Sequence, residues 1–366
     1  MSKFNEIHAA GTSLWFDFIR RDLLEDGGLA DLVAEGIRGV TSNPSIFQKA
    51  IAESSEYDDD IRSALEHNPD SSVNDLYESF AIEDVRAAAD ILRPVYDDSD
   101  GADGFVSLEV SPLLASETEA TVAEARRLWK AVDRPNLLVK VPATAEGVPA
   151  IETLIGEGIN VNVTLIFSLE HYESIARAYL RGLEAAADPS RIASVASFFV
   201  SRVDTLTDSL LDGAGTEAAL ALRGKAGIAN SKQAYRLYEE LFGEEAFGHL
   251  AARGARPQRL LWASTGTKNP AYSDVLYVEE LIGPNTVNTA PPATIDAFRD
   301  HGTVPGATLL AGWDEADEVI DALAACGVDF DGVTATLQEE GVAAFANAFQ
   351  SLMATLEEKA GLVRAG

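Results

Sequence analysis

The sequence predicts an α/β fold, a (β/α)8 or TIM barrel with extra helices between its second and third strands and a C-terminal helix. Eight short runs rich in β-branched residues alternate with longer segments of helical spacing. No internal repeat or low-complexity linker divides the chain, and its 366 residues suit one large barrel. We therefore expect a single domain over residues 1–366. A doubly wound open sheet is the alternative that the same alternation allows.

The expected strands are short, and helical segments such as ASETEATVAEARRLWKAV and LEHYESIARAYLRGLEAAA follow the third and the fifth of them. The strand runs are 13–19, 36–42, 104–110, 136–143, 160–167, 193–200, 259–265 and 285–291. Eight strands, each followed by helical spacing, are the pattern of a parallel barrel.

Two segments exceed what a minimal barrel needs. Residues 44–103 separate the second and third runs and read as several helices broken at HNPDSS, ending in the acidic turn YDDSDGADG. A C-terminal helical segment is expected over residues 330–364. Its apolar residues recur at steps of three and four along one face: Val342, Phe345, Phe349, Leu352 and Leu356. Such a face must pack on the barrel or on a partner subunit, so a homodimer is one expectation.

Charge and composition narrow the function classes. The net charge is −31, from 28 basic and 59 acidic residues, which argues against nucleic acids and anionic membranes as partners. A phosphate-bearing ligand would need local arginine or lysine to overcome this field. A single cysteine, the lack of an apolar leader and the lack of an 18-residue apolar run lead us to expect a cytoplasmic protein. Scattered histidines and missing glycine-rich nucleotide motifs predict no metal site and no cofactor.

Polar side chains recur near the C-terminal ends of six expected strands. In NVNVTLIF, Asn160, Asn162 and Thr164 share one face, whereas the apolar residues up to Leu165 share the other. A half-solvated antiparallel sheet shows the same alternation, but in a parallel barrel the polar face points inside. The other strands contribute Asp17, Thr41, Asn43, Ser107, Glu109, Lys140 and Ser197. Barrel enzymes draw their catalytic groups from these strand ends, so we expect the set to converge.

Lys140 stands out because it alone of eight lysines lies inside an apolar strand, within NLLVKVPAT. A lone strand lysine commonly guards a sheet edge, but a closed barrel has no edge. Burial disfavours a charged ammonium, and a neutral amine can attack a ketone. The sequence therefore predicts Schiff-base chemistry, in which the iminium draws electrons from the adjacent carbon–carbon bond without a metal. Asp17 and Glu109 are the candidate acid–base groups, and Thr164 is a candidate to position a water.

The chain resembles the transaldolase family over nearly its whole length. The resemblance lies in the long motifs GVTSNPSIFQKAI, VSLEVSP, LLVKVPAT, GINVNVTLIFS, ASFFVSR and NTVNTAPPATIDAF. It implies a class I aldolase-type barrel whose fourth strand carries the imine-forming lysine, which agrees with Lys140 by count. It also implies sugar phosphates as partners: a dihydroxyacetone unit would pass from sedoheptulose 7-phosphate to glyceraldehyde 3-phosphate, giving erythrose 4-phosphate and fructose 6-phosphate in the non-oxidative pentose phosphate pathway.

The resemblance assigns roles to the candidate residues. Asp17 takes the acid–base role at carbon–carbon cleavage, and Glu109 and Thr164 hold the water that shuttles protons to the imine. Three further residues fall where the family holds the hydroxyls of the dihydroxyacetone unit: Asn43, Asn162 and Ser197.

The phosphate-binding residues are expected on two segments. Arg202, in FVSR, falls on the family's phosphate-binding arginine, and a guanidinium suits phosphate bidentately. The chain departs from the family after the seventh strand, where a Ser-aromatic-Arg turn is replaced by WASTGTKNP. Ser264 and Lys268 are therefore expected in place of that motif, although a lysine is a point charge rather than a fork.

Two other functions stay open at this stage. A fructose 6-phosphate aldolase-type class I lyase would use the same lysine but let water release the three-carbon unit. A non-catalytic sugar-phosphate-binding barrel would have little reason to bury Lys140. The chain length and the C-terminal helix favour the transferase.

Overall fold

A closed barrel of eight parallel strands forms the centre of the computed structural model, which describes residues 2–52 and 54–365. The strands are β1 (Thr12–Phe16), β2 (Gly39–Val40), β3 (Phe105–Glu109), β4 (Leu137–Pro142), β5 (Val161–Ile166), β6 (Ser194–Phe199), β7 (Arg259–Ala263) and β8 (Thr286–Ala290). Each strand pairs with the next, and β8 closes on β1 with Thr12 opposite Thr286. The predicted barrel and all eight predicted strands are confirmed.

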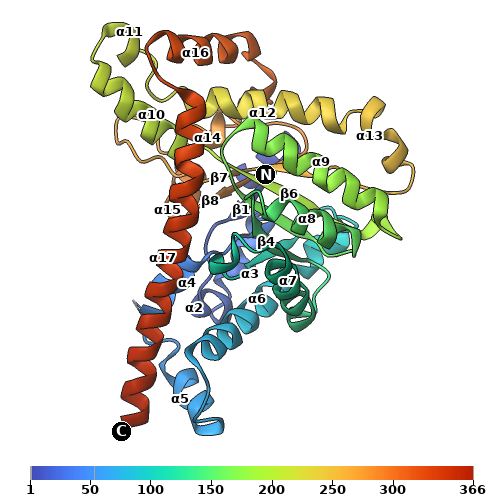
Figure 1. Ribbon diagram of the computed structural model, residues 1–366, viewed down its shortest axis with the longest axis vertical. Coiled ribbons are helices and arrows are strands. Elements are labelled where there is room, and N and C mark those ends of the chain that lie inside the picture. The colour runs from blue at the N-terminus through green and yellow to red at the C-terminus, as the bar shows by residue number, and fades with distance from the viewer. Residues whose placement is uncertain (1, 53, 366) are drawn as a thin grey trace.

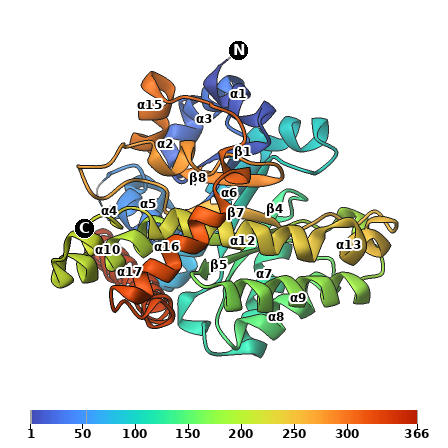
Figure 2. The same ribbon diagram turned by 90° about the horizontal axis from the view of Figure 1, so that it is seen from above.

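Helices surround the strands (Figures 1 and 2). They are α1 (Lys3–Ala9), α2 (Arg21–Glu25), α3 (Gly28–Glu35), α4 (Pro44–Ala52), α5 (Asp58–His67), α6 (Val73–Asp98), α7 (Thr118–Val132), α8 (Gly147–Gly156), α9 (Leu169–Ala185), α10 (Ser201–Ala214), α11 (Glu217–Leu220), α12 (Ala226–Phe242), α13 (Glu244–Ala251), α14 (Leu276–Glu279), α15 (Pro292–His301), α16 (Trp313–Ala325) and α17 (Phe330–Ala365). Short 3-10 turns add η1 (Pro112–Leu114), η2 (Pro189–Arg191) and η3 (Thr308–Leu310). No helix within the described ranges is long and apolar enough to cross a membrane.

The predicted helical insert consists of α4, α5 and α6. The chain is irregular between α5 and α6, at the predicted break. Ser72 then begins α6 with a capping box: its hydroxyl accepts from the Asp75 amide at 3.1 Å, and the Asp75 carboxylate accepts from the Ser72 amide at 3.1 Å. The longest helix of the insert, α6, therefore begins at a capping box that is encoded locally in the sequence.

The C-terminal helix α17 packs on its own chain. It lies along α4, α5, α6 and α10 and touches η1 and β5, and Figure 1 shows it running from α10 at one end to α5 at the other. On its predicted apolar face, Phe345 and Phe349 are buried, as are Leu352 and Leu356, whereas Val342 is partly buried. The predicted apolar face is confirmed, and it packs against the helices and the barrel of the same chain.

The alternation predicted for β5 ends one residue early. Asn162 and Thr164 are buried as members of the inner face, and Val161 and Val163 join the large core shared with the surrounding helices. Leu165 does not follow them, because it has a positive φ of 63° and the pairing with β6 shifts between Val163 and Ile166. Its side chain instead packs in a second cluster with Phe167. The expectation that Leu165 shares the outer face was wrong.

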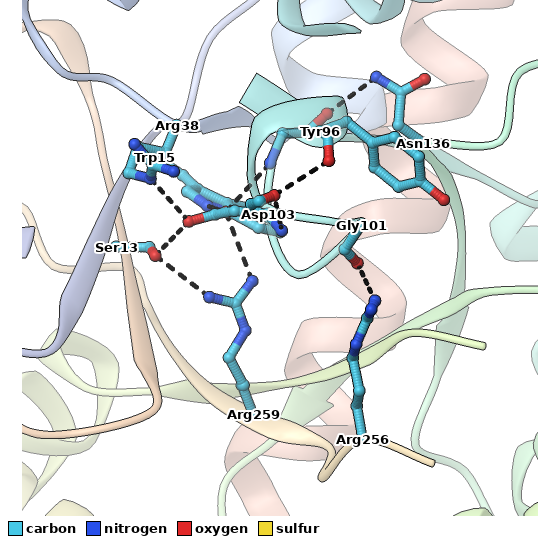
Figure 3. A network of polar contacts seen from close by, with 11 residues as sticks. Ser13, Trp15, Arg38, Tyr96, Gly101, Asp103, Asn136, Arg256 and Arg259 are labelled. Atoms are coloured by element: carbon cyan, nitrogen blue, oxygen red, sulfur yellow. Dashed lines mark hydrogen bonds and ion pairs between the residues drawn. The ribbon is translucent and has the colours of Figure 1, made fainter. Parts of the chain in front are cut away.

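The N-terminal end of the barrel is closed by an ion-pair network around Asp103 (Figure 3). This carboxylate accepts from Trp15 Nε1 at 2.9 Å and from the Ser13 hydroxyl, and it pairs with Arg38 at 3.0 Å and Arg259 at 3.4 Å. Burial would raise the pKa of Asp103, but the charges of Arg259 and Arg38 and its hydrogen bonds outweigh burial and lower it. Asp103 is the last acidic residue of the predicted turn. The turn is therefore not wholly exposed, because the buried carboxylate of Asp103 holds the barrel strands together.

Candidate active site

A cavity of about 300 Å³ lies at the C-terminal ends of the strands. Eight of the ten predicted site residues line it: Asp17, Asn43, Lys140, Thr164, Ser197, Arg202, Ser264 and Lys268. The remaining two, Glu109 and Asn162, are buried and do not line the cavity. The barrel thus brings together residues spread over 250 positions of the sequence, as expected for strand ends that share one mouth.

Lys140 lies on β4 and is 5% exposed. Parallel pairing places it opposite Glu109 of β3 on one side and Asn162 of β5 on the other. Its Nζ donates to the Ser42 carbonyl at 3.3 Å and lies 3.5 Å from Oε2 of Glu109. The ring of Phe345 lies on another side, with its centroid 5.4 Å from Nζ. The amine is therefore held in a nearly dry pocket with one carboxylate beside it.

Glu109 is a buried carboxyl on β3, next to Lys140. Burial raises the pKa of this carboxyl to about 7, although the neighbouring Lys140 acts to lower it. Among the described residues, neither Oε2 of Glu109 nor Oγ1 of Thr164 has a hydrogen-bond partner. An unpaired buried oxygen is costly, so Oγ1 of Thr164, which lines the cavity, is available to a ligand or water there, whereas Oε2 of Glu109 lies outside the cavity lining and 3.5 Å from Nζ of Lys140.

Asp17 follows β1 directly and is held in place by its neighbours. Its backbone amide donates to the Ala290 carbonyl at 2.9 Å, and its carboxylate accepts from the Thr41 hydroxyl at 2.6 Å. Desolvation raises the pKa of Asp17, against the lowering effects of Thr41, Lys140 and more distant cations. A carboxyl with a raised pKa on the rim of the cavity suits reversible proton transfer.

The polar residues on β3, β5 and β6 form a short hydrogen-bonded row. The Ser197 hydroxyl donates to Oδ1 of Asn162 at 2.7 Å, and Nδ2 of Asn162 donates to the Ser107 hydroxyl at 2.9 Å. Asn162, the middle member of this row, is fully buried. On the other side of the mouth, Oδ1 of Asn43 accepts from the Ile46 amide at 3.0 Å, at the start of α4. Ser197 and Asn43 face the cavity, whereas Asn162 orients Ser197.

A cationic region forms another part of the cavity. Arg202 stands in the first turn of α10, with its guanidinium 5.2 Å from the ring centroid of Phe199. Desolvation lowers the pKa of Arg202 from its usual value. The Ser264 hydroxyl, on a residue with φ of 56°, lies 2.9 Å from the Ser201 hydroxyl. Neither Arg202 nor Lys268 forms an ion pair with any residue in the described part of the chain. Both cations are therefore free to bind an anion.

The structure adds residues that the sequence reasoning missed. Ser45 and Lys49 line the cavity from α4, and Phe199 and Phe345 line it from β6 and α17. Ser45 and Lys49 lie one turn apart on a helix that starts at the end of β2, a spacing that could have indicated them. Nothing local to Phe345 connects it with Lys140, because the contact spans about 200 residues of sequence.

The chain is similar to known proteins over nearly its whole length. A sequence model of the transaldolase/fructose-6-phosphate aldolase family matches residues 14–356. The chain is 51% identical to a transaldolase of Frankia alni, over 98% of this chain and 97% of that protein. It is 52% identical to a transaldolase of Thiobacillus denitrificans over 97% of this chain and 100% of that protein. A transaldolase of Thermobifida fusca is 51% identical, with 96% of each chain covered.

Proposed function

This chain belongs to the transaldolase/fructose-6-phosphate aldolase family, and from this premise we propose that it is a transaldolase that works through a Schiff base on Lys140. It is an enzyme of the transferase class. Its reaction passes a dihydroxyacetone unit from sedoheptulose 7-phosphate to glyceraldehyde 3-phosphate, within the non-oxidative pentose phosphate pathway. The observation that carries the mechanism is the buried Lys140 beside Glu109, in a cavity that is also lined by the cationic side chains of Arg202 and Lys268.

The first step joins the ketose to the enzyme. The amine of Lys140 adds to C2 of the ketose, and the resulting carbinolamine loses its hydroxyl as water to leave a cationic carbon–nitrogen double bond. Glu109, whose pKa of about 7 lets it hold or release a proton, serves this exchange through a water that it shares with Thr164. The unpartnered Oγ1 of Thr164 in the cavity and the position of Glu109 Oε2, 3.5 Å from Nζ of Lys140, support that role.

The second step cuts the bond between C3 and C4. Asp17 removes the proton of the C4 hydroxyl, the C3–C4 electron pair moves toward the iminium, and the aldehyde departs. A neutral enamine of three carbons stays on Lys140. The same steps in reverse, with a different aldehyde, complete the transfer, and Asp17 returns the proton to the new hydroxyl.

The remaining polar residues bind the substrate. Asn43 and Ser197 hold the hydroxyls of the three-carbon unit, with Asn162 orienting Ser197. Arg202, Lys268 and the Ser264 hydroxyl bind the phosphate. These local charges offset the repulsion that a net charge of −31 exerts on an anionic substrate. A cytoplasmic location and a homodimer stay part of the proposal on sequence grounds.

Borohydride trapping tests the mechanism. Incubation with fructose 6-phosphate and sodium borohydride reduces the covalent intermediate, and peptide mass spectrometry then locates it. We expect a three-carbon adduct on Lys140 in the wild type and none in a Lys140→Met variant. An adduct on another lysine, or no adduct while the enzyme turns over, would rule out this Schiff base.

A further inference from the structure

Three residues on one face of α17 bring this helix onto the active site. Gln338, Gly341 and Phe345 follow each other at steps of three and four, so they share one face of the helix. Nε2 of Gln338 donates to the Ala143 carbonyl at 2.6 Å, three residues beyond Lys140. The helix is thereby tied to the end of the strand that carries the reactive amine.

Gly341 lets the helix backbone come close to the end of β5. A Cβ added to Gly341 would lie 2.9 Å from Cδ2 of Leu165 and 3.7 Å from Nη1 of Arg202. Both neighbours belong to the mouth of the barrel, since Leu165 follows Thr164 and Arg202 lines the cavity. The close approach positions the next turn of α17 over the cavity.

Phe345 occupies that next turn. It is 5% exposed, it lines the catalytic cavity, and its ring centroid lies 5.4 Å from Nζ of Lys140. A ring face next to this nitrogen is attractive to the cationic iminium and takes up space beside it that water would otherwise occupy. We propose that Phe345 is a specificity-determining residue that shields the three-carbon intermediate on Lys140 from water, so that an aldehyde takes the unit instead.

The chemistry makes this shielding decisive. In transfer, the enamine carbon attacks the acceptor aldehyde, and a new carbon–carbon bond forms. In hydrolysis, the enamine is first protonated to an iminium and water adds to C2. The C2–N bond then breaks, its electron pair returns to Lys140, and free dihydroxyacetone leaves. Transfer and hydrolysis start from the same enamine, so the access of water to it sets the ratio of the two reactions. An active site that excludes water suppresses the hydrolysis.

The test measures that ratio in variants of two phenylalanines on the same helix. One assay follows dihydroxyacetone released from fructose 6-phosphate without acceptor, and the other follows transfer to erythrose 4-phosphate. We expect Phe345→Ala to raise release relative to transfer by on the order of tenfold or more. Phe345→Leu keeps most of the apolar volume and should restore the ratio to within about threefold of wild type.

Phe349→Ala is the matched control. Phe349 lies one turn further along the same face of α17 and is 6% exposed. Its ring packs edge-on against Tyr77, with 5.6 Å between the ring centroids, and it does not line the active-site cavity. The Phe349→Ala variant should lower the melting temperature about as much as Phe345→Ala does, and it should leave the ratio of release to transfer unchanged. An unchanged ratio in Phe345→Ala, or an equal rise in both alanine variants, would overturn the inference.

The inference rests on the proposed role of Lys140, and the two fail separately. If borohydride yields no adduct on wild-type Lys140, the proposed mechanism is wrong. If the adduct forms and the ratio does not respond to Phe345, the mechanism stands and the shielding role is wrong.

Discussion

Replacing Glu109 with glutamine should remove one proton-transfer group and change both activity and the pH dependence of stability. The amide has nearly the same shape as the carboxyl, but it cannot exchange a proton near neutral pH. General acid–base groups contribute about 10²–10⁴-fold to rates, so we expect kcat to fall by this order. The inflection that Glu109 imposes on the wild-type rate near pH 7 should be lost as well.

The effect on stability follows from the raised pKa. Folding raises the pKa of Glu109 from 4.5 to about 7, so the native state binds this proton more tightly than the unfolded state does. The group therefore favours folding at low pH, and its contribution to the free energy of unfolding is lost as pH rises through 7. The difference between these two pKa values corresponds to about 3 kcal/mol.

Urea unfolding at pH 5, 6, 7 and 8 measures this contribution. We expect the wild-type free energy of unfolding to fall more steeply with pH than that of Glu109→Gln, by about 2–3 kcal/mol between pH 5 and pH 8, since the loss begins above pH 4.5. The difference between the two proteins cancels the titration of groups that do not interact with Glu109. Parallel pH profiles would refute the argument, because they would mean that Glu109 titrates alike in the folded and unfolded states.

Three further predictions concern other parts of the molecule. Lys140→Met should abolish transfer, as measured by an activity assay, and keep the fold, as measured by circular dichroism. Residual turnover above about 1% of wild type would contradict the covalent mechanism. Arg202→Ala should raise KM for phosphorylated sugars about 10- to 100-fold and leave KM for unphosphorylated sugars nearly unaffected, whereas Arg177→Ala, an exposed control whose side chain pairs with Glu173, should change neither. Asp103→Asn should cost about 3 kcal/mol of stability at neutral pH because it leaves the partly buried guanidinium groups of Arg38 and Arg259 without their counter-charge. The pKa of Asp103 is lowered on folding, so the wild-type advantage should shrink as pH falls below about 4; a constant difference in urea unfolding across that range would count against this assignment.

The architecture and most of the site could be predicted because their signals are local and periodic. Alternating polar and apolar residues indicate an inward face, and parallel closure brings every strand end to one mouth. Lys140 could be singled out by its setting alone. Local patterns also have a limit, which Leu165 shows: the alternation continues in the sequence after Thr164, but a positive φ breaks it in the structure.

The sequence by itself determined the barrel, the order of its strands and the chemical types of the residues at its mouth, since all of these depend on near neighbours in the chain. Only the tertiary structure decided which side chains meet across the barrel. It placed Asn162 behind Ser197, buried Asp103 under two arginines, and brought Phe345 to Lys140 from about 200 residues away. Contacts of that separation depend on how α17 docks on the barrel, and no short pattern in the sequence encodes the docking.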